Sequence, residues 1–185
     1  MSQTLLNRAT GASGTRPGAS PDAQSVPDYD LIELFFFAYR DFVGDADRLL
    51  EEFGFGRAHH RVLHFVNRHP GLTIAELLDI LNITKQSLNR VLKELLDQGY
   101  VAAQAGENDR RQRRLFPTAK GEELALRLSH IQAARFGRAL ERLADGAREG
   151  AIEFLLAMID EPARARVQNL VWGDLQHNPK RPGEK

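Results

Sequence analysis

Side chains that could recognise nucleic acid are concentrated in two neighbouring segments, residues 84–93 and 107–114. At helical spacing, the first segment turns hydroxyl, amide and basic groups outward, and these groups reach base edges and phosphates in a major groove. They are Thr84, Lys85, Gln86, Ser87, Asn89, Arg90 and Lys93. The second segment is rich in arginine, whose planar, permanently charged head group suits a narrow minor groove. Its candidates are Arg110, Arg111 and Arg113, with Asp109 placed to hold Arg111 by a charge-assisted hydrogen bond.

The chain is neutral as a whole, but its charge is unevenly distributed. It has 25 basic and 25 acidic residues, whereas residues 82–120 hold eight basic and four acidic side chains. Phosphate binding depends on the local field, so a basic face on a neutral protein is sufficient. A solvated surface is the plainer explanation of such a run, and a protein-assembly module with an acidic partner is another. Steep salt dependence together with preference for one sequence would identify double-stranded DNA as the partner.

Histidine is the other residue type that could do chemistry. His60 and His64 lie four residues apart in a predicted helix, so both imidazoles could face one metal ion. The chain has no cysteine, and Glu51 or Glu52 could add a ligand only through tertiary contact. We therefore predict no metal, and keep a metal-responsive regulator using His60 and His64 as an alternative. No nucleophile–base pair, phosphate-binding glycine loop or paired carboxylates in a recognisable context can be found, so we expect neither an enzyme nor a cofactor.

Composition indicates an ordinary globular chain. Its 185 residues are 42% hydrophobic and 27% charged, which allows one domain with a buried core or a small domain with additional helices. No apolar run approaches the roughly 20 residues that span a bilayer. The N-terminus also lacks the apolar core of a signal peptide. We therefore expect a cytoplasmic protein with no membrane partner.

Two short helices and a hairpin must position the candidate side chains. Thr73 and Glu76 have the spacing of a capping box, and Thr84 is placed as the N-cap of the next helix. Each helix carries an i, i+3, i+4, i+7 apolar stripe, and so short a turn between them predicts a helix-turn-helix. Residues 100–104 and 113–116 read as strands joined by a basic wing, and Leu72 could add a further short strand.

Longer helices are predicted on both sides of this unit. We expect helices over residues 28–53, 57–68 and 118–145, another after Gly146, and a last one that starts at Pro162. The first is apolar around much of its circumference, so it needs more than one partner. The small winged module cannot cover this much apolar surface, and a homodimer is the simplest way to bury it.

Five ordered motifs resemble those of the multiple antibiotic resistance regulator (MarR) family of bacterial winged-helix transcription factors. They are Leu72-Thr73-x-x-Glu76-Leu77, Ile83-Thr84-x-x-Ser87-Leu88-x-x-x-Leu92, Leu96-x-x-x-Gly99-Tyr100-Val101, Asn108-Asp109-Arg110-Arg111 and Thr118-x-Lys120-Gly121. The resemblance covers roughly residues 30–160. One departure is Pro117, which stands where the family usually has leucine and is expected to shorten the second wing strand.

The resemblance implies a two-fold dimer on a near-palindromic operator, with half-sites about one helical turn (roughly 10 bp) apart. It also implies a regulator, usually a repressor, that a small anionic or aromatic effector releases from DNA. The candidate effector contacts are Phe36, Tyr39, Arg40, His60 and His64. Packing in the dimer core is the plainer role for these aromatic residues.

The expected fold class is mainly α with a small β-wing. We divide the chain into a disordered arm (1–27), an N-terminal dimerisation helix (28–56) and a winged helix-turn-helix DNA-binding domain (57–117). C-terminal dimerisation helices (118–176) and a flexible tail (177–185) follow. The arm is rich in Gly, Ser, Thr, Ala and Pro, and cannot bury enough apolar surface to offset the entropy of ordering.

Overall fold

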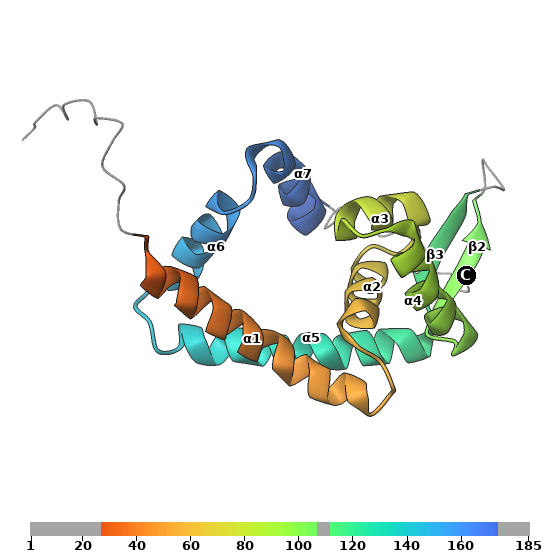
Figure 1. Ribbon diagram of the computed structural model, residues 1–185, viewed down its shortest axis with the longest axis horizontal. Coiled ribbons are helices and arrows are strands. Elements are labelled where there is room, and N and C mark those ends of the chain that lie inside the picture. The colour runs from red at the N-terminus through yellow and green to blue at the C-terminus, as the bar shows by residue number, and fades with distance from the viewer. Residues whose placement is uncertain (1–26, 107–111, 174–185) are drawn as a thin grey trace, which may run out of the picture.

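The computed structural model describes residues 27–106 and 112–173, which form helices and one small antiparallel sheet (Figure 1). This confirms the expected fold class. The helices are α1 (Tyr29–Glu51), α2 (Arg57–Arg68), α3 (Ile74–Leu81), α4 (Lys85–Asp97), α5 (Ala119–Leu140), α6 (Ala147–Ala157) and α7 (Glu161–Trp172). The strands are β1 (Leu72–Thr73), β2 (Val101–Ala105) and β3 (Arg113–Pro117), in the order β1-β3-β2.

Local capping fixes where the helix-turn-helix starts and turns. The Thr73 hydroxyl accepts a hydrogen bond from the Glu76 backbone N–H at 3.2 Å, and the Glu76 carboxylate accepts from the Thr73 N–H at 2.8 Å. This is the predicted capping box. Asn82 ends α3 in the left-handed region (φ 48°), a conformation that asparagine tolerates better than most residues. Thr84 then caps α4, as its sequence position predicts.

The wing strands pair in a regular register that includes Pro117. Ala103 lies opposite Leu115, and the ladder continues to Val101 opposite Pro117. The expected shortening of this strand is therefore wrong. Pro117 is the last residue of β3, where a missing backbone N–H costs little. The next donor in the chain, the Thr118 N–H, bonds to the Tyr100 carbonyl at 3.2 Å and closes the ladder.

One apolar core joins the second half of α1 to α2, α3, α4, α5 and the sheet. Its fully buried side chains come from every one of these elements. They include Leu50, Leu63, Leu77, Leu88, Leu95, Leu115 and Leu128. The core therefore fixes the back of the helix-turn-helix directly against the long helix α5.

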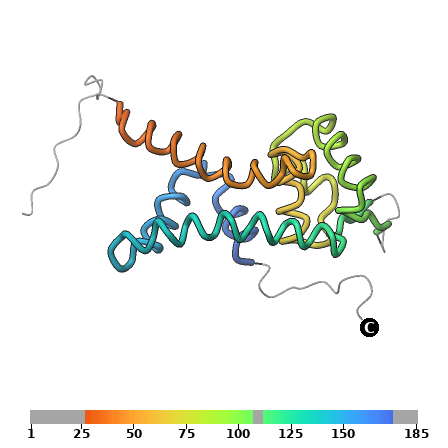
Figure 2. The backbone as a smooth tube through the Cα atoms, turned by 90° about the horizontal axis from the view of Figure 1, so that it is seen from below, coloured from red at the N-terminus to blue at the C-terminus, as the bar shows by residue number. Residues whose placement is uncertain are grey.

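The remaining helices lie largely outside this core. Residues 29–41, the first half of α1, are exposed along their whole length, and α6 and α7 have no buried residue. Figure 2 shows the first turns of α1 standing away from α5. Figure 1 shows α6 and α7 turning back from the end of α5 towards α3, where Arg166 donates to the Asp79 carbonyl oxygen at 3.0 Å.

Helix α5 ends earlier than predicted. The expectation of residue 145 used Gly146 as the stop, but the helix ends at Leu140. There the backbone changes to tight turns, with the Arg142 N–H on the Ala139 carbonyl and the Leu143 N–H on the Leu140 carbonyl. Gly146 has a positive φ (80°) and instead precedes α6. Within the described ranges, none of the helices has the length and apolar character needed to cross a membrane.

Candidate nucleic-acid interface

Helix α4 has a buried face and a polar face that fit a recognition helix. Leu88, Val91, Leu92 and Leu95 are buried in the core. The opposite face exposes four polar side chains that make no hydrogen bond or ion pair with any other residue the structure describes. They are Lys85, Gln86, Asn89 and Arg90. Because these groups have no partner among the described residues, they are available to an external partner. Figure 1 shows α4 beside β2 and β3 at one end of the molecule.

Three other predicted contacts on α4 already have partners in the chain. Thr84 caps the helix and donates to the Ser87 hydroxyl at 2.9 Å, so these two hydroxyls also organise the first turn. Lys93 donates to the Asp97 carboxylate at 2.6 Å, and this bond raises the pKa of Lys93. Both side chains of that pair are exposed, so solvent screens the interaction. Lys93 is therefore a weaker candidate for phosphate than Lys85 or Arg90.

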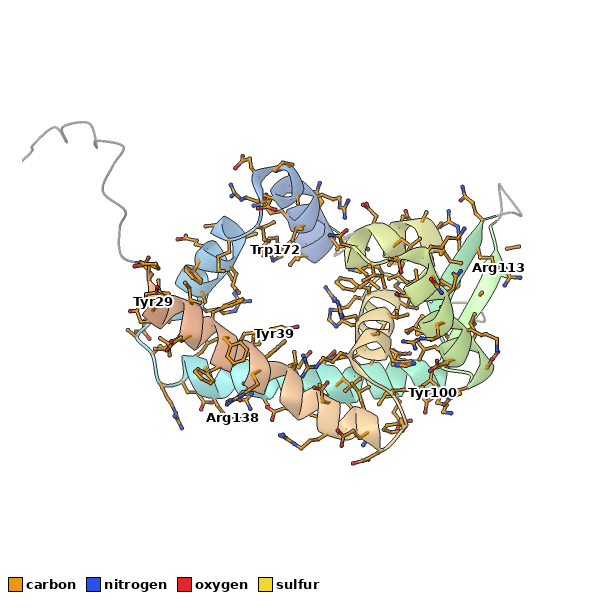
Figure 3. All side chains as sticks on the ribbon, viewed as in Figure 1. Tyr29, Tyr39, Tyr100, Arg113, Arg138 and Trp172 are labelled. Atoms are coloured by element: carbon orange, nitrogen blue, oxygen red, sulfur yellow. The ribbon has the colours of Figure 1, made fainter. Side chains whose placement is uncertain are left out.

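The wing is described only in part. Arg113 begins β3 with an exposed side chain opposite Ala105. Asp109, Arg110 and Arg111 lie outside the described residues, so their contacts stay predictions. Figure 3 shows Arg113 near the tip of the hairpin, at the end of the molecule that carries α4.

Two further residues support this face, and neither was among the individually predicted DNA contacts. Arg114 donates to the Gly71 carbonyl at 3.3 Å and so ties β3 to the turn before β1. His59 lies behind α4, where its Nε2 is 2.8 Å from a carboxylate oxygen of Glu94. The sequence shows His59 only as a polar residue near the start of a helix. Its partner Glu94 is 35 positions away, so the pairing could not be predicted from local spacing.

A cavity of about 290 Å³ lies between α1, α2 and α5. Its lining is aromatic and cationic. The lining residues are Tyr39, Phe42, Val43, Arg57, His60, Arg61, His64, Phe65 and Gln132. The structure thus brings together Tyr39, His60 and His64 of the predicted effector contacts. Figure 3 shows Tyr39 on α1.

Two predicted effector contacts are used differently. Arg40 forms an ion pair with Asp41 at 2.9 Å, and its guanidinium lies 4.9 Å from the centre of the Phe37 ring. Phe36 is exposed and packs edge-on against Phe37 with ring centres 5.3 Å apart. The cavity instead takes its positive charge from Arg57 and Arg61 of α2, and neither arginine was predicted from the sequence. Arg57 is paired with Asp47 at 2.8 Å, whereas Arg61 is exposed and has no such partner in the described ranges.

The two cavity histidines favour the neutral form. Burial lowers the pKa of His64 to about 4, with smaller contributions from His60, Arg68 and His69. Burial is also the main cause of the lowered pKa of His60. At neutral pH both rings therefore offer one N–H donor and one nitrogen acceptor each. The described residues hold no group of three His, Cys, Asp or Glu side chains arranged for a metal, and the metal-responsive alternative stays untested.

The fold and this polar helix define a winged helix-turn-helix protein of the DNA-binding class. The MarR family model matches residues 53–112. The HTH-type transcriptional regulator PetP of Rhodobacter capsulatus is 46% identical over 139 residues, which cover 75% of this chain and 84% of PetP. The chain belongs to the MarR family of transcriptional regulators.

Solved structures agree with this assignment. The Mycobacterium tuberculosis MarR family protein Rv2887, in complex with p-aminosalicylic acid, is 27% identical with a TM-score of 0.50, covering 68% of this chain and 95% of that one. The S. aureus MepR–DNA complex is 20% identical with a TM-score of 0.58, covering 69% of this chain and 94% of that one. The second likeness concerns the fold alone.

Proposed function

We propose that this regulator reads a specific duplex sequence with α4 while the wing grips the flanking backbone. The observation that carries the proposal is a face of four exposed side chains, without partners in the described part of the chain, on a helix whose other face is fixed in the core. A rigid mount is what base-edge recognition requires, because hydrogen bonds to bases are directional. Arg113 extends the same surface towards the wing.

The test is selection of a duplex from a random-sequence library, followed by fluorescence anisotropy at several salt concentrations. We expect the selected duplex to bind at least about 10³ times more tightly than a scrambled one. Gln86→Ala should reduce this preference, whereas Arg113→Ala should weaken binding to both duplexes and lower the salt slope by about one. Arg138→Ala is the matched control, since Figure 3 shows Arg138 at the other end of the molecule from Arg113.

Failure to enrich any sequence would contradict DNA reading and favour the protein-assembly alternative. That outcome would direct the search to an acidic protein partner. Equal loss of binding in Arg138→Ala and Arg113→Ala would instead mean that general charge, and not the wing, supplies the affinity.

We further propose that the working unit is a homodimer paired through the first half of α1 together with α6 and α7. The support is the amount of apolar surface that a single chain leaves in water. Leu31, Ile32, Leu34, Phe35, Phe36 and Phe37 are each at least 47% exposed, and α6 and α7 add Phe154, Leu155 and Trp172. Contiguous apolar patches of this kind mark association surfaces. Two recognition helices related by a two-fold axis would read a near-palindromic operator with half-sites about 10 bp apart.

We infer that the effector site is the cavity between α1, α2 and α5, and that it takes a small aromatic anion. Tyr39, Phe42 and Phe65 offer ring contacts, and neutral His60 and His64 offer hydrogen bonds. Arg61 adds a positive charge that forms no ion pair with any described residue. The Rv2887 structure holds p-aminosalicylic acid, a ligand of this chemical kind. Helices α1 and α5 extend to the proposed dimer face, whereas α2 belongs to the DNA-binding unit. A ligand in the cavity between these helices would favour one spacing of the two recognition helices over another, and would thereby loosen the DNA complex.

Calorimetric titration with p-aminosalicylate tests the effector proposal. We expect binding that Arg61→Gln weakens about tenfold or more, because a charge-assisted contact is lost. Arg48→Gln serves as the control, since Arg48 is an exposed arginine of α1 that pairs with Asp45. Saturating p-aminosalicylate should then raise the dissociation constant for the selected duplex. Binding that is unaffected by Arg61→Gln would place the ligand elsewhere.

Repression is the proposed regulatory outcome, because relatives that are 37% identical over 81 residues are named transcriptional repressors. A reporter gene placed behind the selected duplex should be expressed less when the chain is present. Increased expression would identify an activator.

A further inference from the structure

The start of α5 is bonded directly to the end of the recognition helix. The Thr118 hydroxyl accepts a hydrogen bond from the Gly121 N–H at 3.1 Å as the N-cap of α5. The same hydroxyl donates to the Gly99 carbonyl at 2.7 Å and lies 3.3 Å from the Tyr100 carbonyl oxygen. One side chain thus begins α5 and closes the turn that follows α4.

Lys120 completes this junction. Its ammonium group donates to the carbonyl of Gln98, the C-cap residue of α4, at 3.2 Å. The same group lies 4.0 Å from the centre of the Tyr100 ring. Carbonyls at a helix C-terminus lack intrahelical donors, and a cation there is favoured by the helix dipole. Lys120 therefore gives a donor to a carbonyl at the C-terminal end of α4 and places its charge over the ring of Tyr100, the residue before β2.

The backbones of α5 and Tyr100 approach each other closely at this junction. A Cβ atom on Gly121 would lie 1.9 Å from the Tyr100 carbonyl oxygen, so the two backbones are in direct contact. Tyr100 is buried and packs edge-on against Phe55 with ring centres 5.0 Å apart. Figure 3 shows Tyr100 where the recognition helix, the hairpin and the long helix meet.

We propose that Lys120 is a positioning residue for DNA recognition, and that it acts by holding the C-terminal end of α4 on α5 rather than by contacting phosphate. The proposal rests on the proposed DNA-reading function. Its sequence position within the basic segment would assign Lys120 to the phosphate-binding charge. The geometry instead places its ammonium group against Gln98 and Tyr100, although the side chain is exposed.

Hydrogen exchange tests the junction without any DNA. We compare the wild type with Lys120→Met, which keeps a long apolar stem but removes the donor and the charge, and with Lys120→Arg, which restores both. Lys120→Met should speed exchange of the backbone amides of Gln98, Gly99 and Tyr100 by roughly three- to tenfold. Lys120→Arg should return the rates close to wild type. Unchanged rates in Lys120→Met would overturn the proposal.

The salt dependence of binding then separates positioning from phosphate contact. Lys85→Met is the matched control, because Lys85 is an exposed lysine at the start of α4 and makes no hydrogen bond or ion pair with another described residue. We expect Lys85→Met to lower the salt slope by about one and to weaken binding to selected and scrambled duplexes alike. Lys120→Met should weaken only the selected duplex, by roughly three- to tenfold, with the slope unchanged.

A salt slope that falls in Lys120→Met as it does in Lys85→Met would show a phosphate contact and overturn the proposal. A wild-type protein that enriches no sequence would contradict the proposed function itself, and the positioning role would fall with it. If the wild type selects a duplex and Lys120→Met keeps the same preference for that duplex over a scrambled one, only the proposed role of Lys120 is contradicted.

Discussion

His59 shows how a polar side chain can be held by both of its ring nitrogens. The Gly56 backbone N–H donates to Nδ1 at 3.1 Å, so Nδ1 carries no proton and the proton must be on Nε2. That Nε2 donates to Glu94 of α4 at 2.8 Å. The ring also stacks on Phe55 with centres 4.6 Å apart. His59 therefore fixes the side of α4 through Glu94, while Lys120 fixes its C-terminal end through Gln98.

His64 predicts a pH dependence of stability at the residue scale. Its pKa is about 4 in the folded chain and about 6.5 when exposed, so the unfolded state binds the proton first as the pH falls. The contribution of His64 to the free energy of unfolding is therefore fully present above about pH 6.5 and is lost as the pH falls towards 4. Between pH 7 and pH 5 we expect His64 to account for a loss of about 2 kcal/mol in the free energy of unfolding.

Urea unfolding of the wild type and His64→Gln at the two pH values measures this loss. The variant should lose less stability than the wild type, because glutamine does not titrate in this range. Equal losses in the two proteins would show that His64 is not the group responsible.

The ends of helices could be predicted from the sequence where they are set by residues close by in the chain. The caps at Thr73 and Thr84 and the bounds of α2 could be predicted, since each depends on side chains within one turn. The end of α5 and the role of Pro117 could not, because each depends on backbone hydrogen bonds that the sequence pattern does not reveal. The same limit applies to Arg57 and Arg61, which reach the cavity only after α2 packs beside α1.

Two glycines of α5 give opposite predictions at the element scale. Gly121→Ala places a methyl group 1.9 Å from the Tyr100 carbonyl, so the junction must open. We expect a loss of at least about 3 kcal/mol in the free energy of unfolding. At Gly137 an added Cβ meets nothing within 4 Å, so Gly137→Ala should stabilise the helix by about 0.5–1 kcal/mol. Thermal and urea unfolding of both variants would check the contrast. A mild effect at Gly121 would mean that the two backbones separate easily.

At the scale of the whole molecule, the chain divides its apolar surface between two uses. The second half of α1 contributes Ala46, Leu49 and Leu50 to the core that α2 and α5 share. Beside them, half-buried Asp45 pairs with Arg135 at 2.6 Å, and that bond lowers the pKa of Asp45. The first half of the same helix lies in water. The sequence predicted that this helix needs more than one partner, but a single sequence cannot say which half serves which partner.

Leu34→Glu tests the proposed pairing. Leu34 is 65% exposed in the single chain, so a carboxylate there should not disturb the core. We expect light scattering to give about twice the 20.8 kDa chain mass for the wild type and the single-chain mass for Leu34→Glu. Binding to the selected duplex should weaken about a hundredfold or more, because each chain would then read one half-site alone. Gln86→Glu adds the same charge on α4 and should keep the wild-type mass. A dimeric Leu34→Glu would place the pairing surface elsewhere.

The exposed half of α1 has a consequence for how the amount of protein controls its output. On the proposed pairing, the number of active units at low abundance rises with the square of the number of chains made. Halving synthesis would then reduce operator occupancy by about fourfold. Chains left single would present bare aromatic side chains to proteases and chaperones, which would remove them first. A gene under this regulator would therefore respond with a threshold, even without any effector.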